Sequence, residues 1–250
     1  MILFDSQAAL PPSSSAWSLA PSSLAQWVSG IGATLAVIVA LFKDPITSWW
    51  RRPRLVATCR KEIPWTVRVP ITVYVPGQAP GQVVVLWSAN CYFIRLQIEN
   101  TGRTRAEKVQ VRALQLERRG IDHNFTEIPT TLPFNMKWSN SPPTGAVTVL
   151  DGISSRMSAF CDIISLCDPA NAHQRRPTGA PTNVTIGQLQ LEFELPDEWI
   201  LLTPGTYRLT LRIAAANVEP IDRTIVFTHS GNWTANDLVM RRDELGVSLN

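Results

Sequence analysis

The sequence has few residues of the kinds that catalyse reactions or bind metal ions. Among 250 residues there are three histidines and four cysteines, and the cysteines are too few and too irregularly spaced for a disulfide scaffold. No Gly-x-Ser-x-Gly elbow, glycine-rich phosphate loop or His-Glu-x-x-His motif is present. Cys161 and Cys167 lie six residues apart without a second cysteine pair nearby, which disfavours zinc. These absences predict a protein that is not an enzyme, with no cofactor and no metal site.

A large excess of charge of either sign is also lacking. The net charge is +3, from 23 basic and 20 acidic residues, and four of the basic but only two of the acidic residues lie in the first 54 positions. The excess is therefore concentrated near the N-terminus, and a strongly basic nucleic-acid-binding domain is not indicated. The apolar fraction of 45% and the nine tryptophans exclude a disordered chain.

The longest stretch without charge runs from Ser6 to Phe42. Its second half, residues 24–42, reads LAQWVSGIGATLAVIVALF, and as a helix it would extend about 28 Å, close to the thickness of a bilayer's hydrocarbon core. No basic residue precedes it, which disfavours a cleaved signal peptide. The sequence predicts an extracytoplasmic segment over 1–23, a transmembrane helix over 24–42, a juxtamembrane collar over 43–54 and a soluble domain over 55–250. A buried core helix is the alternative for residues 24–42.

The collar predicts where the membrane interface lies and which way the chain crosses it. Aromatic and basic residues flank the predicted span, as expected at the headgroup level. These interface residues are Trp27, Lys43, Trp49, Trp50, Arg51, Arg52 and Arg54. Because all the basic ones follow the span, the positive-inside rule places the N-terminus outside and the soluble domain in the cytoplasm, at the inner membrane. In that compartment the four cysteines are expected to be reduced.

Small side chains recur along one face of the predicted span. They are Ala25, Ser29, Gly32, Ala36 and Ala40. Small residues let helix backbones approach each other closely in lipid, so this small-residue stripe predicts a helix–helix interface in a homo-oligomer, or the lining of a pore. The alternative is that the stripe reflects the ordinary frequency of Gly and Ala in membrane helices.

Beyond Arg54 the hydrophobic period changes to two. Within NCYFIRLQIE (residues 90–99), alternate side chains are apolar, a turn Asn100-Thr101-Gly102 follows, and a second alternating segment runs to Leu116. Further alternating segments are separated by Pro, Gly and Asn, and helical periodicity is scarce. This pattern predicts a mainly-β domain, a β-sandwich with long loop insertions between Gly120 and Thr182.

Two motifs carry a family resemblance. The string ENTGRTRAEKVQV (99–111) resembles the Asn-x-Gly, Ala, Val-x-Val pattern of bacterial immunoglobulin-like adhesion and binding modules. TPGTYRLTLRIAA (203–215) resembles their penultimate strand. With the anchor and collar, these motifs resemble uncharacterised bacterial single-pass membrane proteins. The layout is similar to membrane effectors of anti-phage defence, such as the Hailong-type channel subunit, which nucleic acid holds inactive.

Arginine supplies most of the basic charge, and its guanidinium favours phosphate and carboxylate ligands. Arg103, Arg105 and Lys108 lie around the hairpin that residues 90–116 are predicted to form, and they are expected to contact an anion or other ligand. The competing interpretation is that acidic neighbours neutralise them as surface pairs.

Three functions follow from this layout. The leading hypothesis is a homo-oligomeric membrane effector or ion channel gated by its cytoplasmic β-sandwich domain, with antiviral defence as its setting. The alternative is a non-conducting, membrane-anchored binding or adaptor module. The third is an enzyme with an unrecognised site in the long loops. The expected partners are membrane lipids, further copies of the chain, and a regulatory protein, nucleotide or nucleic-acid ligand.

Overall fold

The computed structural model describes residues 20–76, 83–129, 132–139, 141, 146–170, 179, 181–191 and 201–250, without the side chains of 20–26, 42–50, 73–76, 83 and 86–87. The chain divides into two compact units, Met1–Trp50 and Arg51–Asn250. The predicted segment 1–23 lies outside the described residues up to position 19. The predicted boundaries at 24, 43 and 55 stay predictions.

The first unit contains one long helix, α1 (Ala20–Arg51). It begins before the predicted span and continues past Pro45 to Arg51. The large apolar side chains between Trp27 and Leu41 are all exposed, with fractions from 46% at Ile38 to 71% at Trp27. Within the described residues, no helix combines the length and apolar character that crossing a membrane requires. The transmembrane helix over 24–42 therefore remains a prediction.

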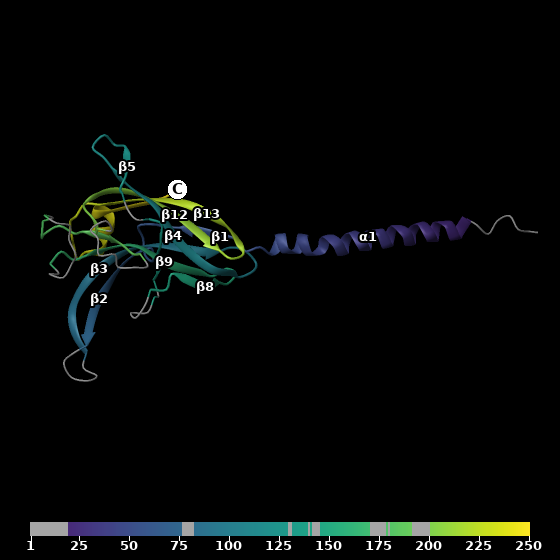
Figure 1. Cartoon of the computed structure of the whole chain (residues 1–250), viewed down its shortest axis with the longest axis horizontal. Coiled ribbons are helices and arrows are strands. Elements are labelled where there is room, and N and C mark those ends of the chain that lie inside the picture. The colour runs from purple at the N-terminus through teal and green to yellow at the C-terminus, as the bar shows by residue number, and fades with distance from the viewer. Residues whose placement is uncertain are drawn as a thin grey trace, which may run out of the picture. The chain divides into compact units, whose positions relative to one another are not determined.

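The second unit is a β-sandwich of two antiparallel sheets, each with seven strands among the described residues (Figure 1). In the first sheet the main strand order is β1-β3-β9-β10-β11, with β2 on β3 and β7 on β9. Its strands are β1 (Leu55–Thr58), β2 (Thr66–Pro76), β3 (Val83–Asn100), β7 (Lys137–Trp138), β9 (Ser158–Cys167), β10 (Gly187–Leu189) and β11 (Leu201–Leu202).

In the second sheet the main order is β14-β13-β12-β4-β5, with β6 and β8 on β4. Its strands are β4 (Ala106–Arg119), β5 (Phe125–Glu127), β6 (Phe134–Asn135), β8 (Val149–Ile153), β12 (Gly205–Ala215), β13 (Val218–His229) and β14 (Leu245–Leu249). The mainly-β prediction is therefore confirmed.

The core consists of the side chains that alternate inward from both sheets. From β3 these include Ile94, Leu96 and Ile98, and from β12 Leu209 and Leu211, all at most 1% exposed. Alternation along a strand sends every second side chain to the same face, so these apolar sets meet between the sheets. Each such residue contributes about 1.5–3 kcal/mol by leaving water. The predicted inward face of residues 90–99 is confirmed.

The segment Thr101–Arg105 joins the two sheets and is not the turn of a hairpin. β3 belongs to the first sheet and β4 to the second, so the strands on either side of Asn100-Thr101-Gly102 do not pair. The sequence pattern suggests two adjacent strands but cannot show to which sheet each belongs. The pattern is equally satisfied when both apolar faces meet across the core, as they do here.

The C-terminal segment forms a helical turn before the last strand. α2 (Asp237–Val239) is capped by Asn236, whose side chain accepts from the amides of Leu238 and Val239, and it continues into the π-turn η2 (Met240–Glu244). Leu238 is 74% exposed, whereas Leu245 at the start of β14 is buried.

A disulfide joins Cys91 on β3 to Cys167 on β9. The two residues lie directly opposite each other in the register of these antiparallel strands, with their Cα atoms 4.0 Å apart. The expectation of four reduced cysteines is therefore wrong for this pair, because the pairing of distant strands brings together residues separated by 76 positions. Cys59 and Cys161 are free and buried, and burial raises the pKa of Cys59 to about 12.

Candidate functional site

Three segments meet at the end of the sandwich where the chain enters from α1. They are residues 51–54, the β3–β4 connection with the start of β4 (99–108), and the end of β8 with the following turn (151–157). Together they carry seven basic side chains and three acidic ones. The basic ones are Arg51, Arg52, Arg54, Arg103, Arg105, Lys108 and Arg156. We call this set the basic pole. With their three acidic residues included, the three segments have a net charge of +4, whereas the whole chain has +3.

The side chain of Asn100 holds the three segments together. Its Nδ2 donates to the carbonyl oxygens of Thr104 (2.7 Å) and Ile153 (2.9 Å). Its Oδ1 accepts from the amides of Arg54 (3.1 Å) and Gly102 (3.0 Å). Asn100 is fully buried, and all four hydrogen-bonding positions of its amide are used. This one side chain therefore fixes the backbone on which the basic residues stand.

Further hydrogen bonds fix residues 51–54 to the same place. The Thr104 hydroxyl donates to the carbonyl oxygen of Arg51 (2.6 Å), and the Thr101 amide donates to that of Arg54 (2.8 Å). Gly102 allows this approach, because a Cβ there would lie 2.5 Å from backbone atoms of residues 52–54. Residues 51–54 are thus bonded directly to the β3–β4 connection.

Two of the predicted ligand contacts share one carboxylate. Nη2 of Arg105 and Nζ of Lys108 each lie 2.7 Å from an oxygen of Asp151. These partners, Lys108 first, lower the pKa of Asp151. Arg105 and Lys108 nevertheless remain 49% and 66% exposed, so both can also meet an anion from solvent. The structure brings Arg103, Arg105 and Lys108 together with the collar arginines, which the sequence placed in a separate segment.

Two basic-pole residues have a backbone that side chains other than glycine seldom adopt. Lys108 has a φ of 51° and Arg156 a φ of 61°, and this left-handed region costs an ordinary L-residue about 1–2 kcal/mol. Both positions carry a cation instead of the glycine or asparagine that fits more easily. Glycine at either position would remove a positive charge and would also fit the left-handed backbone better. Charge can therefore be removed from the basic pole without a loss of stability.

The basic pole is expected to bind surfaces rich in phosphate. The test uses residues 51–250, which contain both sheets and the whole core. Replacing Lys108 and Arg156 by glycine should weaken binding to phosphatidylserine vesicles about thirtyfold, because each basic residue near such a surface contributes about 1 kcal/mol. Vesicle sedimentation measures the loss, and urea unfolding should show no destabilisation. Replacing Arg119 and Arg242 by glutamine, at the other end of the sandwich, is the control. Equal weakening by the control pair would show that only net charge matters.

The predicted helix–helix residues that the structure describes all lie exposed on α1. These are Ser29, Gly32, Ala36 and Ala40. Trp27 is likewise exposed, whereas the side chains of Ala25, Lys43, Trp49 and Trp50 lie outside the described residues. On a different face of α1, Trp27, Gly30, Ile31, Thr34 and Leu35 border a groove of about 450 Å³. Gly30 and Gly32 are two residues apart, so they point about 200° from each other. The helix thus offers two faces for close packing.

Other chemically notable groups are held in structural pairs. Asp162, on the outer side of β9, accepts from Nε of Arg95 (2.9 Å) and from the Ser139 hydroxyl (2.6 Å). Desolvation by burial, more than these partners, sets its pKa, which is raised. In the part of the chain that the structure describes, no three His, Cys, Asp or Glu side chains are grouped to hold a metal ion.

His229, at the end of β13, is an uncharged core residue. It is 2% exposed and its ring stacks on Tyr207 with the centroids 6.3 Å apart. Desolvation lowers its pKa from 6.5 to about 4, against an opposing contribution from the backbone of Leu202 and Thr203. Apart from the apolar alternation around His229, no pattern in the sequence indicates this role.

Stability should fall between pH 6.5 and 4 because of His229. The unfolded chain takes up the proton at pH 6.5 and the folded domain only near pH 4, so stability present above pH 6.5 is lost as the pH falls to about 4. The full difference is about 3 kcal/mol. Urea unfolding at several pH values should show this slope, and His229→Gln should reduce it. An unchanged slope in the variant would contradict the assignment.

Comparison of the chain with protein-family models, with curated proteins and with solved structures gives no match.

Proposed function

We propose that this chain is a homo-oligomeric membrane effector, in which the β-sandwich controls how the α1 helices pack and so opens an ion channel or perturbs the bilayer. The observation that carries the proposal is the run of large apolar side chains from Trp27 to Leu41, all of which are exposed in a single copy of the chain. Antiviral defence is the setting that the resemblance in layout suggests.

The exposed helix supports a role in lipid. The large apolar side chains of residues 27–41 are all exposed, and a contiguous apolar surface of this kind marks a part of the molecule that lipid or other protein covers. The basic pole supports the same arrangement, because positive charge beside the end of a membrane helix attracts anionic headgroups. We place the interface at the basic pole and the predicted collar.

The orientation with the sandwich in the cytoplasm is part of the proposal, and the disulfide opposes it. Positive residues after the span favour the cytoplasm, whereas a disulfide such as Cys91–Cys167 persists mainly in oxidising compartments. Alkylation of intact cells with a membrane-impermeant thiol reagent decides between them in the variant Ile121→Cys, because Ile121 is fully exposed whereas Cys91 is buried. Protection of position 121 in intact cells, with labelling after lysis, supports the cytoplasmic side. Labelling in intact cells would reverse the orientation.

Expression of the full chain tests the effector directly. A potential-sensitive dye should report depolarisation of the host membrane by the natural sequence, and the Gly32→Leu/Ala36→Leu variant should abolish it at equal abundance. An unchanged membrane potential, with the protein present in the membrane, would remove the channel. The alternative, a non-conducting anchored adaptor, would then account for the helix and the basic pole. Retention of full partner binding by residues 55–250 alone would support that alternative.

A further inference from the structure

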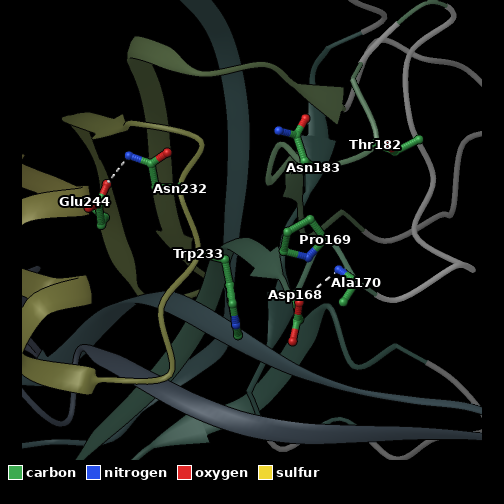
Figure 2. A pocket seen from close by; sticks show the side chains of 8 residues that line it. All are labelled: Asp168, Pro169, Ala170, Thr182, Asn183, Asn232, Trp233 and Glu244. Carbon is green, nitrogen blue, oxygen red and sulfur yellow. Dashed lines mark hydrogen bonds between the residues drawn. The ribbon is translucent and has the colours of Figure 1, made fainter.

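A pocket of about 810 Å³ lies at the end of the sandwich opposite the basic pole (Figure 2). β3 connects the two ends. Asn100, at one end of β3, holds the backbone of the basic pole. Towards the other end of β3, the carbonyl oxygen of Asn90 accepts from the amide of Asp168 in the pocket wall (3.0 Å). Ten residues of strand separate these positions by about 33 Å. We call this cavity the distal pocket, and its chemistry is the reverse of that at the pole.

The distal pocket is lined by two carboxylates, two side-chain amides, one hydroxyl and one aromatic ring, together with Pro169 and Ala170. Asp168 and Glu244 supply carboxylates, Asn183 and Asn232 supply amides, and Trp233 supplies an indole. Among the described residues that line the pocket, none is basic. In the view of Figure 2, Trp233 stands between Glu244 and Asn232 on one side and Asp168 on the other. Two carboxylates beside an aromatic face attract a cation.

The Glu244 side is held in place before any ligand arrives. Oε2 of Glu244 accepts from the hydroxyl of Ser230 and from Nδ2 of Asn232 (3.1 Å). The Ser230 amide also donates to the carbonyl oxygen of Glu244 (3.1 Å). Both side-chain hydrogen bonds use Oε2 of Glu244, so Oε1 has no partner among the described residues. A fixed carboxylate with one oxygen to spare binds a ligand donor at little entropic cost.

Trp233 and Asp168 are equally well anchored. The Trp233 ring packs on Tyr92 with the centroids 5.2 Å apart, within a small second core that includes Met240 and Leu245. Asp168 directly follows Cys167, whose disulfide to Cys91 ties this end of β9 to β3. Its Oδ1 accepts from the amide of Ala170 (2.9 Å). The three groups that would meet a cation thus stand on fixed backbone from three segments of the chain.

We propose that the distal pocket binds an organic cation that carries N–H donors on an apolar stem, such as an alkylguanidinium. A guanidinium can donate to the carboxylate of Asp168 or of Glu244 while its stem lies against Trp233, and the other carboxylate adds to the negative charge that attracts it. A quaternary ammonium fits less well, because it has no N–H to donate and prefers a cage of several aromatic rings, whereas one ring lines this pocket among the described residues. The proposal is independent of the proposed membrane function.

Calorimetry of the full chain in detergent with L-argininamide tests the proposal. L-citrullinamide is the matched ligand, because it keeps the α-ammonium group and nearly the same shape but has a neutral urea in place of the charged guanidinium. We expect saturable binding of argininamide and at least tenfold weaker binding of citrullinamide. Comparable affinity for the two compounds, or no saturable binding of argininamide, would overturn the proposal. An acetylated peptide with a single arginine shows whether the source of the guanidinium is a free molecule or a polypeptide: tighter binding of the peptide indicates a polypeptide.

Isosteric variants locate the binding site. Glu244→Gln and Asp168→Asn should each weaken argininamide about tenfold, because each removes a charge-assisted hydrogen bond of about 1.4 kcal/mol. Asp243→Asn is the control, since Asp243 neighbours Glu244 in sequence but pairs with Arg242 (2.7 Å) and does not line the pocket. Equal weakening by Asp243→Asn would overturn the assignment to this pocket.

Discussion

Replacing Asn100 by alanine is expected to destabilise the β-sandwich by about 3–5 kcal/mol. The change removes four hydrogen bonds at a fully buried position and leaves two amides and two carbonyl oxygens without their partner. A buried polar group that loses its partner costs about 1–3 kcal/mol. Because the lost partners belong to different segments, they cannot pair with one another without moving the backbone.

Urea unfolding of residues 51–250 measures the loss, with Asn90→Ala as the matched control. Asn90 lies on the same strand but is exposed, so its replacement should change stability by less than about 0.5 kcal/mol. Hydrogen exchange adds a local readout, since the amides of Arg54 and Gly102 should lose protection in Asn100→Ala. A loss below about 1 kcal/mol would show that Asn100 does not hold the basic pole together.

Removing the Cys91–Cys167 disulfide is expected to have an effect of similar size. The bond closes a loop of 76 residues, and restricting the unfolded chain to that extent contributes about 4 kcal/mol in the chain-entropy account. The Cys91→Ser/Cys167→Ser variant should therefore unfold at lower urea concentration than the natural sequence.

A reducing agent supplies the control for the disulfide. Reduction should lower the stability of the natural sequence to that of the double variant and leave the double variant unchanged. If reduction has no effect on the natural sequence, the bond does not stabilise the domain in solution. If the double variant also responds to the reductant, Cys59 or Cys161 is involved instead.

The sequence predicts individual strands well because burial imposes a strict period of two. The alternation of Ile94, Leu96 and Ile98 predicts the inward face of β3 even when its partner strands are not known. The partner strands cannot be predicted in the same way. The turn after Asn100 looks like a hairpin in sequence, and only the sheet topology shows that it crosses the core.

The candidate sites are harder to predict because their residues are distant in sequence. The clusters at 51–54 and 103–108 are visible as runs of basic residues, but their meeting depends on the amide of Asn100. The Asn-x-Gly motif carries a signal that was available, since asparagine side chains often bond the backbone two residues on. The distal pocket combines Asp168 with Trp233 and Glu244, and no local pattern links them.

The central claim of a homo-oligomer is tested most directly by the native mass of the full chain in mild detergent. The mass is compared among the natural sequence, Gly32→Leu and Gly30→Leu. The Cβ that each substitution adds has no neighbour within 4 Å in one copy. An effect on the native mass is therefore expected to arise between copies. A defined assembly of three or more subunits that Gly32→Leu disrupts and Gly30→Leu preserves is the result this account predicts. Disruption by Gly30→Leu alone would move the interface to the groove beside Thr34, and a monomer throughout would contradict the oligomeric effector.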